Sequence, residues 1–311
     1  VCVMRIARVR IESMATPVLA FECDGAVYDV AVLESSTGAP GYGGADFHAR
    51  VVSIGCAGLH PQYERLRAGH RPTAARLPRG SFLPLPPCDT DRAAYVQLGP
   101  YDLRGEQPQF LHGTARSAVG EGQPVAFVQQ DVMPDFEAGV AVVLQDDLWR
   151  ATPGQAKQAV LGYSLVLDWT AWHDDDAWHA RPVWLDAPSQ LGPTLVTEDE
   201  LGKLSQLQAR VRVGSDEWSA GAVGDWAFSP AESLAFVSQH LELRAGDVVG
   251  LGRFLMGSAR RVGRQLKFGD RVEVSVGRLG RLSGWAVPGP AAVPWRRNGQ
   301  RRTPPKPPER R

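Results

Sequence analysis

The sequence predicts a β-rich α+β fold, because short alternating strands outnumber short capped helices along the chain. The run RVEVSV at 271–276 is a clear strand, since its valines alternate with polar residues as in a strand with one buried face. Helix starts are marked by capping residues, and Thr152, followed by Pro153 and Gln155, is one example. With 43% hydrophobic residues among 311, the chain can bury a sizeable core.

The first part of the chain, residues 1–71, is expected to form a small N-terminal β-rich domain. Apolar and polar residues alternate in RIARVRI (5–11), AVYDVAVL (26–33) and ARVVSIG (49–55), so each run is expected to be a strand. The segment 72–92 is rich in proline and arginine. Because proline lacks the N–H that a central strand needs, we expect a linker or a covering loop there.

Residues 93–290 are expected to form the larger unit, with three short helices among its strands. Ser229, Pro230 and Glu232 repeat the capping pattern of the helix that starts at Thr152, and Thr197 with Glu200 gives a third capping box. The runs QARVRV and DVVGLG are expected to be strands, like RVEVSV.

The C-terminal segment 291–311 is expected to be a disordered, basic, proline-rich tail. Its last sixteen residues carry seven lysines or arginines and one acid, and they show no apolar periodicity. A basic tail can contact nucleic acid, but a solvated tail is the simpler reading, and no nucleic-acid partner is expected. The chain has no run of eighteen apolar residues and no signal-peptide pattern, so we expect a cytoplasmic protein without a membrane span.

Several kinds of site find no support in the sequence. The four cysteines, Cys2, Cys23, Cys56 and Cys88, have no metal-site or disulfide spacing, and we expect reduced, mostly buried thiols. No phosphate-binding glycine loop and no nucleophile elbow is present. We therefore expect neither a nucleotide nor an organic cofactor.

A strand, helix and strand between Asp135 and His173 carry the most informative pair of residues. Glu137 lies on the first strand and Asp168 near the end of the second, so the two carboxylates can meet on neighbouring strands. Paired acids at strand ends suggest a metal site. Two residues after Glu137, on the same side of the strand, stands Gly139.

Six motifs in this order resemble the core domain of the fumarylacetoacetate hydrolase family over about 95–287. They are DFEAGVAVVL, AVLGYSLVLDWTA, QLGPTLVTEDEL, ARVRV, DWAFSPAESLAFVSQHLELRAGDVVGLG and LKFGDRVEVSVGRLGRLSGW. The resemblance implies a mixed β-roll with a few short helices, a small N-terminal β domain and a homodimer. It also implies an enzyme that chelates a β-dicarbonyl or 2-oxo acid on Mg, Mn or Ca and forms an enolate.

The resemblance assigns the metal ligands and shows a departure from the family pattern. Glu137 matches the first glutamate of the family's Glu-x-Glu motif and Asp168 matches the third ligand, but Gly139 replaces the second glutamate. Asp102 could supply a replacement ligand. The sequence is therefore equally consistent with two possibilities: that the site binds Mg or Mn, and that Glu137 is a structural relic that binds no metal.

Substrate contacts and acid–base groups are also carried over residue by residue. Trp172 stands where the family has a basic substrate contact, and the lid dyad that activates water in hydrolytic members is not identifiable. His173 and His112 are the candidate acid–base residues. The candidate substrate-binding residues are Trp172, Tyr101, Arg181, Trp226 and Arg253.

The sequence thus predicts a member of this family with a divergent active site. Five tryptophans around the site are either core residues or the lining of an apolar cavity, namely Trp169, Trp172, Trp178, Trp184 and Trp226. The first hypothesis is an enzyme that acts on a bulky apolar β-dicarbonyl or enol substrate, as in secondary metabolism. Its reaction would be C–C cleavage, cyclisation, decarboxylation or isomerisation. The alternative is a non-catalytic binding or scaffolding protein that keeps the fold.

Overall fold

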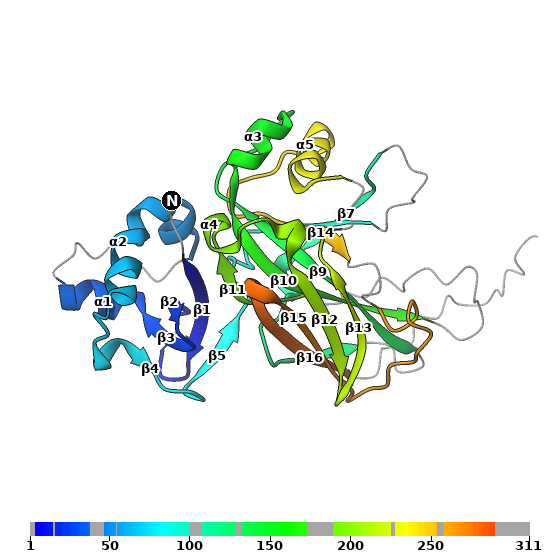
Figure 1. Ribbon diagram of the computed structural model, residues 1–311, viewed down its shortest axis with the longest axis horizontal. Helices are drawn as coiled ribbons and strands as arrows, with labels where there is room; N and C mark the ends of the chain where they lie inside the picture. Colours follow the sequence, from blue (N-terminus) through cyan, green and yellow to red (C-terminus); the bar gives the residue numbers. More distant parts are fainter. Residues whose placement is uncertain are drawn as a thin grey trace, which may run out of the picture.

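Two sheets make up most of the protein in the computed structural model, which describes residues 4–14, 16–37, 47–53, 55–99, 107–127, 132–172, 189–224, 228–253 and 258–289. The larger sheet has eleven strands in the order β4-β3-β2-β1-β11-β10-β9-β14-β6-β7, with β5 paired to β1. The smaller sheet has the order β13-β12-β15-β16-β8. Figure 1 shows the smaller sheet packed beside the green central strands of the larger one.

The strands and helices follow one another in a β-rich order, which confirms the predicted fold class. The strands are β1 Arg5–Ile11, β2 Val18–Cys23, β3 Ala26–Asp29, β4 Arg76–Leu77, β5 Phe82–Leu85, β6 Ala94–Leu98, β7 Phe110–Thr114, β8 Pro124–Phe127, β9 Met133–Leu144, β10 Val160–Trp172, β11 Ser189–Val196, β12 Gln208–Val213, β13 Asp216–Ala222, β14 Val248–Arg253, β15 Arg271–Val276 and β16 Gly280–Pro288. The α-helices are α1 Val30–Thr37, α2 Gly55–Arg67, α3 Pro153–Gln158, α4 Glu198–Leu201 and α5 Pro230–His240, and a π-helix, η1, spans His48–Ser53. Short 3-10 turns lie at Thr73–Ala75, Ala115–Ser117, Leu204–Gln206 and Gly277–Leu279.

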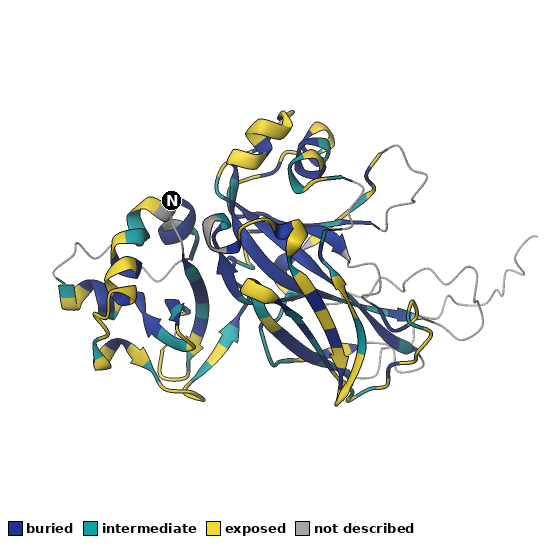
Figure 2. Cartoon of the chain, viewed as in Figure 1, coloured by how far each residue is buried: buried dark blue, intermediate teal, exposed yellow. Residues whose placement is uncertain are grey.

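The central strands β9 and β10 of the larger sheet are largely buried on both faces, and the two faces belong to different cores. Side chains such as Val140, Leu167 and Trp169 pack against the smaller sheet in one cluster. Residues one position away in the same strands, such as Val166, join a second cluster with helices α1 and α2. Figure 2 shows the buried central strands between these layers. Strand alternation therefore assigns each residue of β9 and β10 to one of two environments.

One of the predicted N-terminal strands is correct only in its first half, and another is wrong. AVYDVAVL contains β3, but helix α1 begins at Val30, because Asp29 Oδ1 accepts hydrogen bonds from the backbone N–H groups of Ala31 (2.8 Å) and Val32 (3.2 Å). Residues 49–53 of ARVVSIG lie in the π-helix, whose core residue Val51 comes four positions after the core residue Phe47. A helical spacing across a short apolar run thus prevailed over the apparent alternation.

The segment 72–92 contains strands β4 and β5, and both are short. Strand β5 pairs with β1, and β1 also pairs with β11 of the later part of the chain. Residues of the first and second predicted units therefore share one sheet. The domain boundaries themselves stay a prediction, and the tail at 291–311 lies outside the described residues.

The predicted helices of the larger unit are present, with one difference at a helix start. Complete capping boxes begin α3 at Thr152 and α5 at Ser229. The hydroxyl of Thr197 does not cap α4; it accepts a hydrogen bond from the backbone N–H of Met4 at 2.8 Å. The third capping box is therefore wrong, because Thr197 instead ties the start of β1 to the end of β11.

The cap of α5 gives a testable contribution to stability. Ser229 Oγ accepts from the N–H of Glu232 at 3.3 Å, and the Glu232 carboxylate accepts from the N–H of Ser229 at 2.8 Å. We expect Ser229→Ala to lower the free energy of unfolding by about 1 kcal/mol in urea titrations. Ser215→Ala, on an exposed turn, is the control, and equal losses for the two variants would contradict a role of the cap.

None of the helices in the described part of the chain is long and apolar enough to cross a membrane.

Candidate functional site

A pair of carboxylates lies where β9 and β10 run antiparallel. Asp168 and Glu137 are cross-strand partners, directly opposite each other in the register. Both are partly exposed, whereas Phe136 and Trp169 beside them in sequence are almost fully buried on the other face. Since directly opposed residues of antiparallel strands project to the same side, the two carboxylates share one face of the sheet. The structure thus brings together Glu137 and Asp168, two of the three predicted metal ligands.

Asp168 is held by two hydroxyl groups. The Tyr95 hydroxyl lies 2.8 Å from Oδ1 and 3.0 Å from Oδ2 of Asp168, and Ser189 Oγ donates to Oδ1. The Tyr95 oxygen also lies 2.6 Å from Oε1 of Gln97. The single phenol proton thus has three acceptor oxygens within reach, two on Asp168 and one on Gln97.

The Tyr95 hydroxyl is protonated and donates to Asp168. Burial raises the pKa of Tyr95 well above its ordinary value, and the negative charges of Asp168 and Glu137 raise it further. The group therefore keeps its proton in the neutral pH range and serves as a donor. Sequence reasoning missed Tyr95 and Ser189, although the alternation of AYVQL could have placed Tyr95 and Gln97 on one face of a strand.

Gly139 is enclosed by backbone. A Cβ atom built on Gly139 would lie 2.4 Å from the carbonyl oxygen of Gly252 and 3.4 Å from Cγ1 of Val166. Strand β14 approaches here through a register irregularity that pairs Arg253 with Gly139. The position of the missing second glutamate is therefore filled by the neighbouring strand.

The described residues do not fit the three-carboxylate metal site that the resemblance implies. Glu137 and Asp168 are two carboxylates, and among the described residues no group of three or more His, Cys, Asp or Glu side chains could hold a metal ion. Both oxygens of Asp168 already receive hydrogen bonds from the Tyr95 hydroxyl. Mg²⁺ keeps several waters and is often bound through one or two carboxylates, so the pair lacks the third carboxylate of the family site but supplies the oxygen donors of a water-completed shell. Asp102 lies outside the described residues.

The other candidate residues are only partly brought to this site. His112 is exposed on β7 opposite Val96, which belongs to the core on the face of the sheet away from Tyr95. The backbone of Trp172 ends β10, and the backbone of Arg253 ends β14 beside Gly139. The candidates that lie outside the described residues are His173, Tyr101, Arg181 and Trp226.

One tryptophan that the sequence placed near the cavity is a core residue. Trp169 is 2% exposed, packs edge-on against Phe127 and Phe136, and donates from its indole N–H to Gln190 at 3.3 Å. Its strand position puts it on the face of β10 away from Asp168. Trp169 therefore stabilises the contact between the sheets and does not line the site.

The thiols of Cys23 and Cys88 are free and buried, as expected for these two cysteines. Burial raises the pKa of the Cys88 thiol to about 12, so the nucleophilic thiolate form is scarce at neutral pH.

Comparison with known proteins supports the fold and the order of the motifs. The sequence model described as "Fumarylacetoacetate (FAA) hydrolase C-terminal" matches residues 89–285. An oxaloacetate tautomerase of Bacillus subtilis is 28% identical over 192 residues, covering 60% of this chain and 64% of that protein. A maleylpyruvate hydrolase of Aquipseudomonas alcaligenes is 26% identical over 167 residues, covering 54% and 55%. The chain thus spans less than two thirds of the length of these two relatives.

A solved structure gives the likeness in three dimensions. It is a maleylpyruvate hydrolase from Sphingobium sp. SYK-6 in complex with manganese(II) and pyruvate, and it superposes with a TM-score of 0.70. The superposition covers 92% of this chain and 100% of that one, at 19% identity. At this identity the likeness concerns the fold alone.

Proposed function

Because the chain belongs to the fumarylacetoacetate (FAA) hydrolase family, we propose that it is an enzyme acting on a β-dicarbonyl substrate or its enol through an enolate. The observation that supports this most directly is the Glu137–Asp168 pair on one face of β9 and β10. Relatives of the chain named as an oxaloacetate tautomerase and a maleylpyruvate hydrolase act on compounds of this class. The site is proposed to be divergent, because Gly139 stands where the second glutamate is expected.

Glu137 is proposed as the proton acceptor of this reaction. The Asp168 carboxylate already receives hydrogen bonds from Tyr95 and Ser189, so its position is fixed and its charge is compensated. Glu137, directly across the strand pair, then takes a proton from the carbon between the two carbonyl groups. The C–H bonding electrons move onto a carbonyl oxygen to give the enolate, and return of the proton to carbon or oxygen completes an isomerisation.

The charge of the site favours an uncharged substrate. Glu137 and Asp168 place two carboxylates on the same face of the sheet, and nearby like charges repel a dianionic acid. An apolar β-diketone does not meet this repulsion, in agreement with the bulky apolar substrate that the sequence suggests. Arg253, whose backbone pairs with Gly139, is the proposed cation for the enolate oxygen. Trp172, which ends β10, is proposed to contact the substrate.

Proton exchange in heavy water tests this function without knowledge of the natural substrate. Acetylacetone, uncharged, and oxaloacetate, charged, are the two probes, and proton NMR follows deuterium uptake at the carbon between or next to the carbonyls. We expect the parent chain to exchange acetylacetone faster than buffer alone. Glu137→Gln and Asp168→Asn should each lower the enzyme-dependent rate by about 10²–10⁴-fold.

The exposed residue Glu217 on β13 supplies the control, since Glu217→Gln changes the same chemical group away from the site. This variant should keep the parental rate. Formation of acetate would identify C–C cleavage, whereas exchange alone would identify isomerisation. If no β-dicarbonyl probe exchanges faster than in buffer, the non-catalytic binding or scaffolding alternative replaces the enzyme hypothesis.

A further inference from the structure

A cavity of about 370 Å³ lies in the N-terminal part of the protein, away from the carboxylate pair. It is lined by residues of β3, β4 and β5 and of the turns beside them. In the larger sheet β4 is at one end, and β3, β2, β1 and β11 lie between it and β10, which carries Asp168. Figure 1 shows β4 well separated from β9 and β10. The cavity is therefore a candidate binding site separate from the proposed catalytic site.

The floor of the cavity is apolar. Val27 and Leu77 are cross-strand partners in β3 and β4, so their side chains project to the same side of the sheet. Phe82 of β5 also lines the cavity, and all three side chains are only partly buried. They pack against a small cluster of buried residues, namely Ala7, Val9, Val18 and Ala20. The cavity thus offers a partly uncovered apolar surface on which the hydrocarbon part of a ligand can be buried.

The charged residues that line the cavity are two arginines, Arg76 and Arg79. Nη2 of Arg79 lies 3.5 Å from the carbonyl oxygen of Gly25, and a Cβ atom on Gly25 would lie 4.0 Å from the same nitrogen. This guanidinium group is therefore placed over the turn between β2 and β3, which lines the cavity. Within the described part of the chain neither arginine forms an ion pair with an acid.

The acids next to the cavity are already paired with other arginines. Glu22 lies at the end of β2 and pairs with Arg5 at 3.4 Å. Asp24, in the turn that follows, pairs with Arg71. Among the described residues the positive charge of the two cavity arginines is thus not compensated. Because the N–H donors of a guanidinium group match the two oxygens of a carboxylate, the charge of the cavity favours a ligand with a carboxylate.

We propose that the cavity formed by β3, β4 and β5 binds a small monocarboxylate with an apolar body. The apolar body lies on Val27, Leu77 and Phe82, and Arg79 binds the carboxylate with the help of Arg76. The cavity is at the lower end of the roughly 300–1,000 Å³ that small-molecule sites occupy, which suits a ligand of one ring and a short chain. This site goes beyond the proposed function, because the substrate proposed for the carboxylate pair is uncharged.

A ligand-observed NMR titration with 4-phenylbutyrate tests the proposal, since this compound joins one ring to one carboxylate. We expect the full chain to bind it with a dissociation constant of about 0.1–1 mM, which is the affinity that a ligand of this size can reach. The uncharged amide, 4-phenylbutyramide, should bind about tenfold more weakly because it lacks the charge. Acetate, which lacks the apolar body, should also bind about tenfold more weakly.

Two pairs of substitutions locate the binding in the chain. Arg76→Gln with Arg79→Gln should raise the dissociation constant about tenfold, and Arg79→Gln alone should account for the larger share. Both arginines are exposed, so we expect the variant to fold like the parent. Arg65→Gln with Arg212→Gln is the matched control: Arg65 is exposed on α2, and Arg212, exposed on β12, donates to a backbone carbonyl at 3.2 Å. The control removes the same charge and should keep the parental dissociation constant.

Several outcomes would overturn the proposal. One is a parent chain that leaves the NMR signals of 4-phenylbutyrate unchanged, and another is an amide that binds as tightly as the acid. Equal affinity of the parent and the cavity variant, or equal weakening by the cavity pair and the control pair, would also overturn it. The proton-exchange assay uses the carboxylate pair on other strands, so loss of one activity does not decide the other.

Discussion

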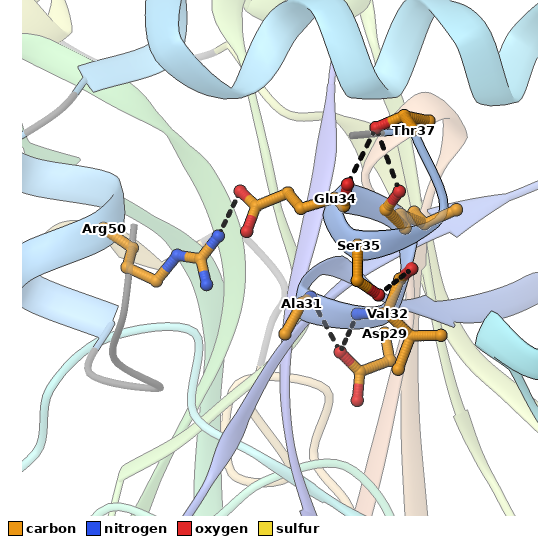
Figure 3. A network of polar contacts seen from close by, with 8 residues as sticks. Asp29, Ala31, Val32, Glu34, Ser35, Thr37 and Arg50 are labelled. Carbon is orange, nitrogen blue, oxygen red and sulfur yellow. Dashed lines mark hydrogen bonds and ion pairs between the residues drawn. The ribbon is translucent and has the colours of Figure 1, made fainter. Parts of the chain in front are cut away.

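Replacing Glu34 by glutamine is expected to lower the free energy of unfolding by about 3 kcal/mol, because it leaves the positive charge of Arg50 buried without a counter-charge. The Glu34 and Arg50 side chains form an ion pair between α1 and η1, and the two residues are only 1% and 3% exposed. Figure 3 shows the Arg50 guanidinium pointing at the Glu34 carboxylate. Urea unfolding of Glu34→Gln against the parent measures the effect.

Two further variants show whether the cost comes from the buried charge. Glu217→Gln breaks an ion pair in which the Glu217 side chain is 42% and the Arg210 side chain 63% exposed. It should lower the free energy of unfolding by about 0–1 kcal/mol. Arg50 Nε is buried and has no hydrogen-bond partner among the described residues, so the pair is incompletely satisfied. Replacing both partners by Glu34→Leu and Arg50→Met should therefore recover much of the loss. Equal losses for the buried and the exposed glutamate would contradict this account.

Local patterns were sufficient to predict most elements of the larger unit. RVEVSV forms β15 with its three valines buried, and the caps at Thr152 and Ser229 form as expected, because these signals act within one strand or one helical turn. The N-terminal part was harder to predict. In AVYDVAVL the decisive residue is Asp29, which caps α1, and in ARVVSIG Arg50 pairs with Glu34 of α1, a contact that the alternation of the run does not indicate.

The contacts of the candidate site between residues close in the sequence could be predicted, and those between distant residues could not. Glu137 and Asp168 lie on strands joined through one short helix, so their meeting follows from the order of the elements. Tyr95 is 73 positions before Asp168, and their contact requires β6 to pair with β14 and β14 to pair with β9. The alternation of AYVQL indicates a strand but does not indicate which strands lie beside it in the sheet. The reason for Gly139 was equally hidden, since it depends on the approach of Gly252.

The enclosure of Gly139 leads to the second large expected effect. Gly139→Ala is expected to lower the free energy of unfolding by about 1–3 kcal/mol, because the new Cβ would lie 2.4 Å from a backbone carbonyl of β14. Gly221→Ala in β13 is the matched control, since nothing lies within 4 Å of its Cβ position and the change should be close to neutral. Urea unfolding of the two variants measures the difference.

Gly139→Glu should be more destabilising than Gly139→Ala and should not create a metal site. The added carboxylate would have to push β14 away and would then lie beside the charges of Glu137 and Asp168, where repulsion adds to the steric cost. Thermal melts with and without Mn²⁺ should show a lowered melting temperature that Mn²⁺ does not restore. A variant that melts like the parent and is stabilised by Mn²⁺ would show that β14 can yield at Gly252. In that case the replacement of the second glutamate by Gly139 would be what prevents metal binding among the described residues. Strand β14 would then lie close to β9 because position 139 is a glycine.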